Sequence, residues 1–144
     1  MDAIDYKIIE LLQVNARLSI AEIARQVNLS RPSVSERLAK ILDSGAIENF
    51  TALVSPAALG KKIVYFMELS DLKIPSDHLV KILSDNPHVT EIHCVTGKTN
   101  YLVKACVPDV DAMNKCLIEL TKHCHVVTSI VLHSPLPHRP VKPV

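Results

Sequence analysis

The sequence contains no tryptophan, few aromatic residues and almost no net charge. Aromatic residues make up 3% of the 144 residues and hydrophobic residues make up 48%, so the core must be built from aliphatic side chains. Charged residues make up 22%, a balance typical of a packed chain rather than a disordered one. The formal net charge of +1 is too small to identify a polyanionic partner, so a nucleic-acid partner must be argued from local arrangement.

Long apolar runs are also missing. No stretch approaches the roughly 18 consecutive apolar residues that a membrane span requires. The stretch Met1–Asp5 is acidic and lacks the basic and then apolar segments of a secretory signal. We therefore expect a soluble protein with no membrane partner, located in the cytoplasm.

Recognisable enzyme and metal motifs are lacking as well. The sequence contains no G-x-S-x-G, P-loop, H-E-x-x-H or glycine-rich dinucleotide turn, so we expect no enzyme activity, no catalytic residues and no cofactor. The four cysteines show no C-x-x-C spacing, and the densest His/Cys group is Cys116 with residues 123–125. A zinc site needs about four converging ligands, so we interpret these cysteines as small buried hydrophobic residues and predict no metal ligands.

Residues 1–48 are expected to form three short helices. Ser19 and Glu22 match the capping box of a helix start, Ser30 caps a third helix with Pro32 in its first turn, and Gly45 ends it. Three apolar stripes at helical spacing should be buried: Ile4, Ile8, Leu11 and Leu12; Ile20, Ile23, Ala24 and Val27; Val34, Leu38, Ile41 and Leu42. Three helices with a tight turn at 28–29 between the last two indicate a helix-turn-helix domain.

Residues 62–134 change to a mixed pattern. Runs rich in β-branched and aromatic residues predict strands at 62–72, 89–96, 101–107 and 126–132. Two helices are expected in this half. The first opens at Ser76 or Asp77, and the second is capped by Asp109. The order β-α-β-β-α-β is that of a ferredoxin-like domain, so the fold class is α+β. Both faces of this sheet carry apolar residues, and we therefore expect at least a homodimer.

The parts between and after these domains are assigned to a linker and a tail. The run 47–54 is expected to form a strand that connects the two domains. Residues 49–61 as a whole are assigned to this connecting strand and the linker after it. Residues 135–144 are proline-rich and are expected to lack regular structure.

The surface of the third helix carries the candidate DNA contacts. In a helix-turn-helix, the second helix of the motif enters the major groove, where Arg and Lys contact phosphates and base edges. Between residues 30 and 42, three basic residues stand against one acidic residue. A solvated helix would also be charged, but the caps and the turn favour DNA binding. The candidate DNA-binding residues are Ser30, Arg31, Ser33, Ser35, Glu36, Arg37 and Lys40.

Two sets of motifs resemble the Lrp/AsnC family of transcription regulators. In the first half these are Ile4-Asp5-x-x-Ile8-Ile9, the run Asn15 to Ser19, the run Leu29 to Leu38, and Gly45-Ala46-Ile47. In the second half they are Pro87-x-Val89-x-Glu91, Val95-Thr96-Gly97 and the stretch Thr128 to Leu132. The resemblance covers nearly the whole chain, in the family's order.

The resemblance implies a regulator of amino-acid metabolism genes that binds a palindromic double-stranded operator. It further implies a homodimer that can assemble into an octamer, and an amino-acid effector bound near the glycine turn. The residues carried over as effector-binding are Gly97, Lys98, Thr99, Asn100, Tyr101, Thr128 and Ile130. Asn100 stands where the family commonly has Asp, and Asn49 stands where it usually has Gly. A neutral Asn binds an ammonium group more weakly than a carboxylate does.

Two other functions remain open from the sequence. The C-terminal domain could serve as a sensor or assembly module in a chain that does not bind DNA. Alternatively, the His and Cys residues could make the protein a metal-responsive regulator.

Overall fold

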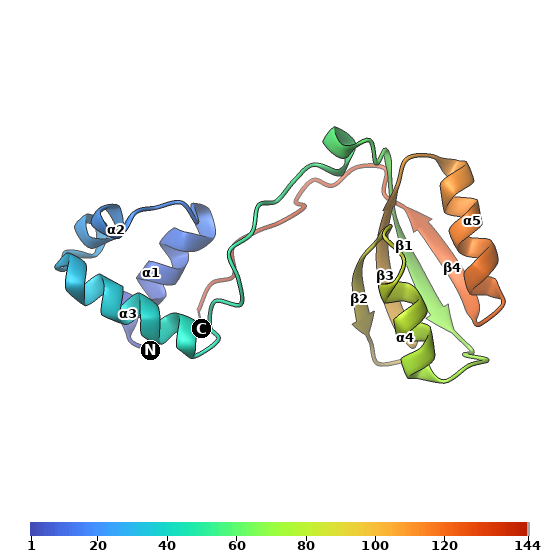
Figure 1. Cartoon of the computed structure of the whole chain (residues 1–144), viewed down its shortest axis with the longest axis horizontal. Helices are drawn as coiled ribbons and strands as arrows, with labels where there is room; N and C mark the ends of the chain where they lie inside the picture. The colour runs from blue at the N-terminus through green and yellow to red at the C-terminus, as the bar shows by residue number, and fades with distance from the viewer. Residues whose placement is uncertain (144) are drawn as a thin grey trace. The chain divides into compact units, whose positions relative to one another are not determined.

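The computed structural model describes residues 1–143 and divides the chain into two compact units (Figure 1). Met1–Leu53 and the tail from Leu136 onward form the first unit, and Val54–Pro135 form the second. The first unit contains three helices, and the second contains a four-stranded antiparallel sheet with two helices in the order β-α-β-β-α-β. The α+β fold predicted from the sequence is therefore confirmed.

The helical unit is built from α1 (Ala3–Val14), α2 (Ile20–Val27) and α3 (Arg31–Asp43). Ser19 and Glu22 form the expected capping box, in which the Glu22 backbone N–H donates to Ser19 Oγ and the Ser19 N–H donates to the Glu22 carboxylate. Ser30 caps α3 by accepting from the Ser33 N–H. These caps satisfy backbone donors that the first turn of a helix otherwise leaves unpaired.

An aliphatic core holds the three helices together. Its buried members are Ile8, Leu12, Ile23, Ala24, Val34 and Ile41. The predicted stripes are correct except at the end of α3, where Leu42 is 40% exposed. Leu42 follows Ile41 directly and so points about 100° around the helix from it, beyond the face that packs on α1 and α2.

No strand forms in the segment 47–54, where the sequence predicts one. A strand requires a hydrogen-bonded neighbour, and no described residue of the chain pairs with this segment. A short 3-10 helix, Pro56–Leu59, follows it and ends at Gly60 in the left-handed conformation. The last strand ends at Ile130, two residues before the predicted end at 132. Residues 135–143 contain neither helix nor strand, as expected for the proline-rich tail, whose last residue, 144, lies outside the described residues.

The second unit is a sheet with the strand order β2-β3-β1-β4. Its strands are β1 (Ile63–Ser70), β2 (Val89–Cys94), β3 (Tyr101–Val107) and β4 (His125–Ile130). Its helices are α4 (Ser76–Ser84) and α5 (Val110–Thr121), the latter capped by Asp109 as predicted. All neighbouring strands are antiparallel, and β1 and β3 occupy the centre of the sheet.

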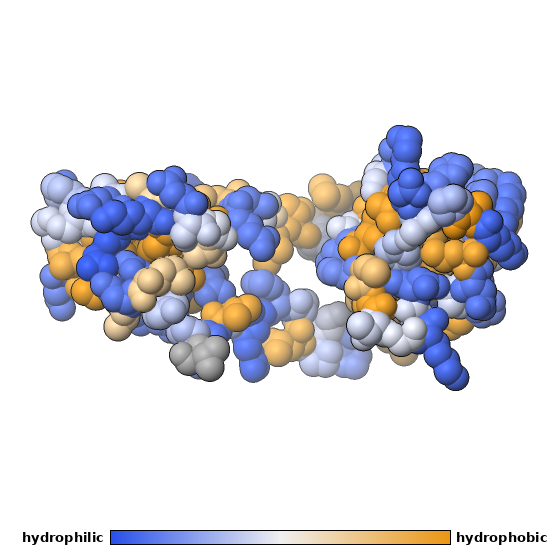
Figure 2. Space-filling view, turned by 90° about the horizontal axis from the view of Figure 1, so that it is seen from below, coloured by the Kyte–Doolittle hydropathy of each residue, from blue (hydrophilic) through white to orange (hydrophobic). Residues whose placement is uncertain are grey.

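One face of this sheet forms the core with α4 and α5. Tyr65, Met67 and Leu69 on β1 and Val103 and Ala105 on β3 are all fully buried there. The alternating residues belong to the opposite face, which neither helix covers. Figure 2 shows hydrophobic residues at the surface of this unit, and Val127 of the uncovered face is 49% exposed. The residues of the uncovered sheet face are Val64, Phe66, Glu68, Glu91, His93, Leu102, Lys104, Cys106, Val127 and Ser129.

The cysteines divide between buried and exposed positions. Cys106, Cys116 and Cys124 are buried free thiols, but Cys94 on the edge strand β2 is exposed, unlike the buried residue we expected. Within residues 1–143, no three His, Cys, Asp or Glu side chains are placed to hold a metal ion. No helix in the same range is long and apolar enough to cross a bilayer.

Candidate nucleic-acid interface

A tight turn sets the position of α3 relative to α2. Asn28 ends α2 in the left-handed conformation, with φ 54° and ψ 45°, and the Leu29 N–H donates to the Ala24 carbonyl at 3.1 Å. Asn tolerates this conformation better than most residues do. Ser30 then caps α3, so only the three residues 28–30 separate α2 from α3. This geometry is that of a helix-turn-helix.

The surface over this turn is a shallow concavity lined in part by two arginines. It has a volume of about 760 Å³, and Arg25 of α2 and Arg31 of α3 are among the residues that line it. Both arginines are exposed, and neither pairs with a carboxylate of residues 1–143. The first turn of α3 also presents its positive dipole end here. Two free guanidinium groups beside a helix start can bind phosphate oxygens.

The outer face of α3 presents hydroxyl and charged groups to solvent. Ser35, Glu36 and Lys40 are all exposed. Lys40 Nζ donates to Glu36 Oε1 at 2.8 Å, and this hydrogen bond lowers the pKa of the Glu36 carboxyl. Their side chains are 73% and 69% exposed, so the pair is weak and easily rearranged.

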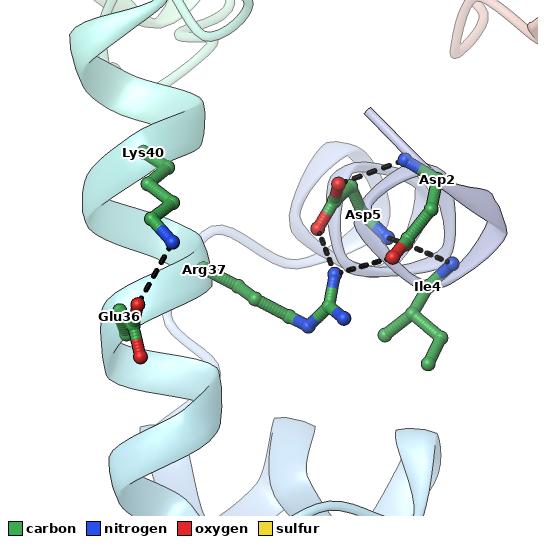
Figure 3. A network of polar contacts seen from close by, with 6 residues as sticks. All are labelled: Asp2, Ile4, Asp5, Glu36, Arg37 and Lys40. Carbon is green, nitrogen blue, oxygen red and sulfur yellow. Dashed lines mark hydrogen bonds and ion pairs between the residues drawn. The ribbon is translucent and has the colours of Figure 1, made fainter.

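Arg37 differs from the other candidates because it points to α1. Its Nη1 donates to Asp2 Oδ2 and to Asp5 Oδ1, each at 2.7 Å, as Figure 3 shows. The two carboxylates raise the pKa of the Arg37 guanidinium, with Asp5 the larger cause. The pKa of Asp5 is lowered, first by the hydrogen bond from the Asp2 N–H and then by Arg37.

The structure thus separates the predicted DNA-binding residues into three groups. Ser30, Arg31 and Ser33 lie together at the start of α3, where the hydroxyls of Ser30 and Ser33 are 2.8 Å apart. Ser35, Glu36 and Lys40 lie along its exposed face, and Arg37 is engaged by Asp2 and Asp5 of α1 and its cap. Arg25 is not among the predicted residues, since the pattern of α2 in the sequence indicates only its buried stripe.

The glycine turn joins β2 to β3. Gly97 has φ +110°, a conformation that other residues rarely adopt, and a side chain there would meet no atom within 4 Å. The Asn100 N–H donates to the Leu69 carbonyl at 2.8 Å, and the Asn100 carbonyl accepts from the Val95 N–H at 3.1 Å. The turn is therefore held by backbone bonds, and the side chains of Lys98 and Asn100 remain exposed.

The other predicted effector residues are not gathered around this turn. Thr128 and Ile130 lie on β4, which is separated from β3 by β1, so about 10 Å of sheet lies between the two strands. Tyr101 is buried, and its hydroxyl is hydrogen-bonded to Ser76. A carboxylate that the sequence did not single out does lie at the turn: Glu68 Oε2 accepts from Thr99 Oγ1 at 3.2 Å.

The two units together define a class of protein: a helix-turn-helix joined to a ferredoxin-like domain. Comparison of the sequence with models of known protein families agrees with this. Residues 1–41 match the model of the AsnC-type helix-turn-helix domain, and residues 72–141 match that of the Lrp/AsnC ligand binding domain. The chain belongs to the Lrp/AsnC family of transcriptional regulators, which are not enzymes.

Individual relatives match along nearly their whole length. The uncharacterized HTH-type transcriptional regulator YezC of Bacillus subtilis is 32% identical over 93% of this chain and 95% of its own. The structure of E. coli AsnC is 30% identical with a TM-score of 0.87, and the match covers 99% of both chains. A third match is to the transcriptional regulator NMB0573 of Neisseria meningitidis, solved as a complex with L-Met. It is 28% identical with a TM-score of 0.90, covering 99% of this chain and 96% of that one.

Proposed function

We propose that this protein is a sequence-specific transcriptional regulator that inserts α3 into the major groove of operator DNA. The observation that carries the proposal is that Arg25 and Arg31, which pair with no carboxylate of residues 1–143, both line the α2–α3 concavity. In this arrangement the residues near the start of α3 reach base edges, while Arg and Lys hold phosphates. We assign base contacts to Ser33, Ser35 and Glu36, and phosphate contacts to Arg25, Arg31 and Lys40.

A second part of the proposal is that two chains pair through the uncovered sheet face. Val64, Phe66, Leu102 and Val127 give this face apolar residues on three adjacent strands. Burial of such a face against a second copy is favourable, since it removes apolar surface from water. Paired helix-turn-helix units require a roughly palindromic operator.

Sedimentation of Phe66→Glu tests the pairing of chains. The new charge lies at the centre of the uncovered face, so the variant should sediment as a monomer where the unmodified chain sediments as a dimer or octamer. The matched control is Ile118→Glu, which places the same charge at a 61% exposed position on α5. A dimer that survives Phe66→Glu as well as Ile118→Glu would contradict pairing through this face.

Selection of genomic fragments by the purified full-length chain tests the DNA-binding function. We expect enrichment of a few palindromic sites, as befits a regulator acting on DNA in the cytoplasm, and loss of that enrichment with Arg31→Ala. A chain that assembles normally but enriches no fragment would instead be a sensor or assembly module. The neighbouring genes identify the regulon, which we expect to concern amino-acid metabolism.

The third part of the proposal is an amino-acid effector at the Gly97 turn. Glu68 supports this assignment because its carboxylate supplies at the turn the negative charge that Asn100 lacks. A carboxylate holds an ammonium group by a charge-assisted hydrogen bond. Thr128 and Ile130 lie too far along β4 to complete the same pocket within one chain, so we assign them to a neighbouring chain's site.

Calorimetric titration with single amino acids tests the effector assignment. We expect Glu68→Gln to weaken the binding of the amino acid that binds the unmodified chain, and Glu91→Gln, an acid on the same sheet face, to leave it unchanged. Binding that is equal in both variants would contradict a role for Glu68.

A further inference from the structure

We infer that Arg37 positions the recognition helix and does not contact DNA. Its guanidinium joins the middle of α3 to the start of α1, over 32 residues to Asp5 and 35 residues to Asp2. This inference rests on the proposed DNA-binding function, because it concerns the helix that would enter the groove. It identifies the N-terminal turn of α1 as a determinant of DNA affinity.

The two carboxylates are held in place independently of Arg37. Asp2 Oδ1 accepts from the backbone N–H groups of Ile4 and Asp5 at 2.9 and 3.0 Å, and Asp5 Oδ2 accepts from the Asp2 N–H at 2.8 Å. Each carboxylate therefore uses one oxygen for the capping box and directs the other at Arg37 Nη1 (Figure 3). A rigid acceptor pair of this kind fixes a guanidinium better than a mobile surface carboxylate does.

Exposure of the side chains separates Arg37 from the true surface charges. The Arg37 side chain is 30% exposed and that of Asp5 is 14% exposed, whereas that of Lys40, three residues further along α3, is 73% exposed. An Arg37 that turned to a phosphate would leave the Asp5 carboxylate without its cation in a partly buried position. That loss opposes the movement.

The charge balance leads to the same conclusion. Both carboxyl groups have a lowered pKa, so both are ionised at neutral pH, and together they outweigh the single charge of Arg37. Arg37 therefore adds no net positive charge to the surface of α3. The cations of α2 and α3 that remain to meet phosphates are Arg25, Arg31 and Lys40.

The salt dependence of DNA binding separates a positioning residue from a phosphate contact. Each lost phosphate contact reduces the slope of log K against log salt by about one. We expect Lys40→Ala to reduce the slope by about this amount. Arg37→Ala should lower affinity several-fold with its slope unchanged, because the remaining contacts are misplaced rather than deleted.

A double-mutant cycle with Asp5 makes the test specific. Asp5→Asn should lower DNA affinity in the same direction as Arg37→Ala, and the double variant should be no worse than Arg37→Ala alone, since Arg37→Ala already removes the ion pair with Asp5. Glu10→Gln controls for the loss of a negative charge, because Glu10 lies on α1 but pairs with Lys7. If Arg37 instead binds phosphate, Asp5→Asn would free it and raise affinity beyond the Glu10→Gln control, and Arg37→Ala would reduce the slope.

The same variants distinguish failure of this inference from failure of the proposed function. The free energy of unfolding of the helical unit, followed by the amide signals of α3, measures the Arg37–Asp5 coupling without DNA. Additive effects of the two substitutions would overturn the inference even if the unmodified chain binds its operator. Strong coupling in a chain that binds no DNA would confirm that Arg37 ties α3 to the start of α1, and it would refute the proposed DNA-binding function.

Discussion

Gln13 and Val141 exchange two hydrogen bonds although 128 residues separate them in the chain. Gln13 Nε2 donates to the Val141 carbonyl at 2.9 Å, and the Val141 N–H donates to Gln13 Oε1 at 2.8 Å. The side-chain amide of Gln13 thus pairs with the backbone of the tail in the way that a neighbouring strand would. Through this contact the C-terminal tail becomes part of the helical unit that begins at the other end of the chain.

Replacement of Gln13 should release the tail. In Gln13→Ala, the Val141 amide loses its acceptor and should exchange with solvent faster, because Val141 is 78% exposed and has little other protection. Amide exchange followed by NMR measures this directly. Gln26→Ala, an exposed glutamine on α2, is the control, and equal Val141 exchange in the two variants would contradict the contact.

The acid pair of α1 should make the helical unit sensitive to low pH. The folded-state pKa values of Asp2 and Asp5 are lowered, so their contribution to stability is complete above the unfolded value of about 3.9. It is then lost as the pH falls through the lowered folded-state values. The stability gap between the unmodified chain and Asp5→Asn should therefore be complete above about pH 4 and should shrink as the pH falls below that value.

Urea unfolding at a series of pH values, followed by the α3 amides, measures that gap. The control is Asp43→Asn, an exposed carboxylate of α3 with no ion-pair partner within residues 1–143. A gap for Asp5→Asn that stays constant down to pH 2 would show that its carboxylate contributes nothing through its charge.

Two neighbouring residues at the end of α3 should differ sharply in their contribution to stability. Ile41 is 2% exposed, so Ile41→Ala should lower the free energy of unfolding by about 2–5 kcal/mol through lost burial and a residual cavity. Leu42 is 40% exposed, and Leu42→Ala should cost about 1 kcal/mol or less. Urea denaturation of the helical unit measures both, and similar costs would contradict the observed orientation of the helix.

A side chain at Gly97 should destabilise the sheet unit through the backbone alone. Gly97→Ala meets no neighbouring atom, so its expected cost of about 1–3 kcal/mol comes from the φ of +110°. Thr96→Ala, at the preceding exposed position, should cost little. Thermal unfolding compares the two variants, and a Gly97→Ala chain as stable as Thr96→Ala would show that the turn relaxes.

Local signals explain why most of the fold was predictable from the sequence. Ser19, Ser30 and Asp109 each cap a helix as expected, because a cap depends on residues within three positions of each other. Strand β3 begins at Tyr101 and ends at Val107, as its pattern and the following proline indicate. The order of these elements along the chain then indicates a helix-turn-helix followed by a ferredoxin-like domain.

The sequence is least informative where the partner of a residue is distant. Arg37 is predicted as a DNA contact because nothing local shows that Asp2 and Asp5 reach it across the domain. The expected strand at 47–54 has the right composition, but a strand exists only with a neighbour, and the chain provides none within its described residues. Glu68 was overlooked because its link to Thr99 depends on the sheet register.

Hydroxyl-radical footprinting of the full-length chain on an enriched genomic fragment tests the central claim most directly. If paired helix-turn-helix units bind DNA through α3, two protected patches should appear, centred about one helical turn or a multiple of it apart. Protection at both patches should weaken together in Arg31→Ala. Uniform protection without two patches, or a footprint that Arg31→Ala leaves intact, would contradict the assignment of α3 as the recognition helix.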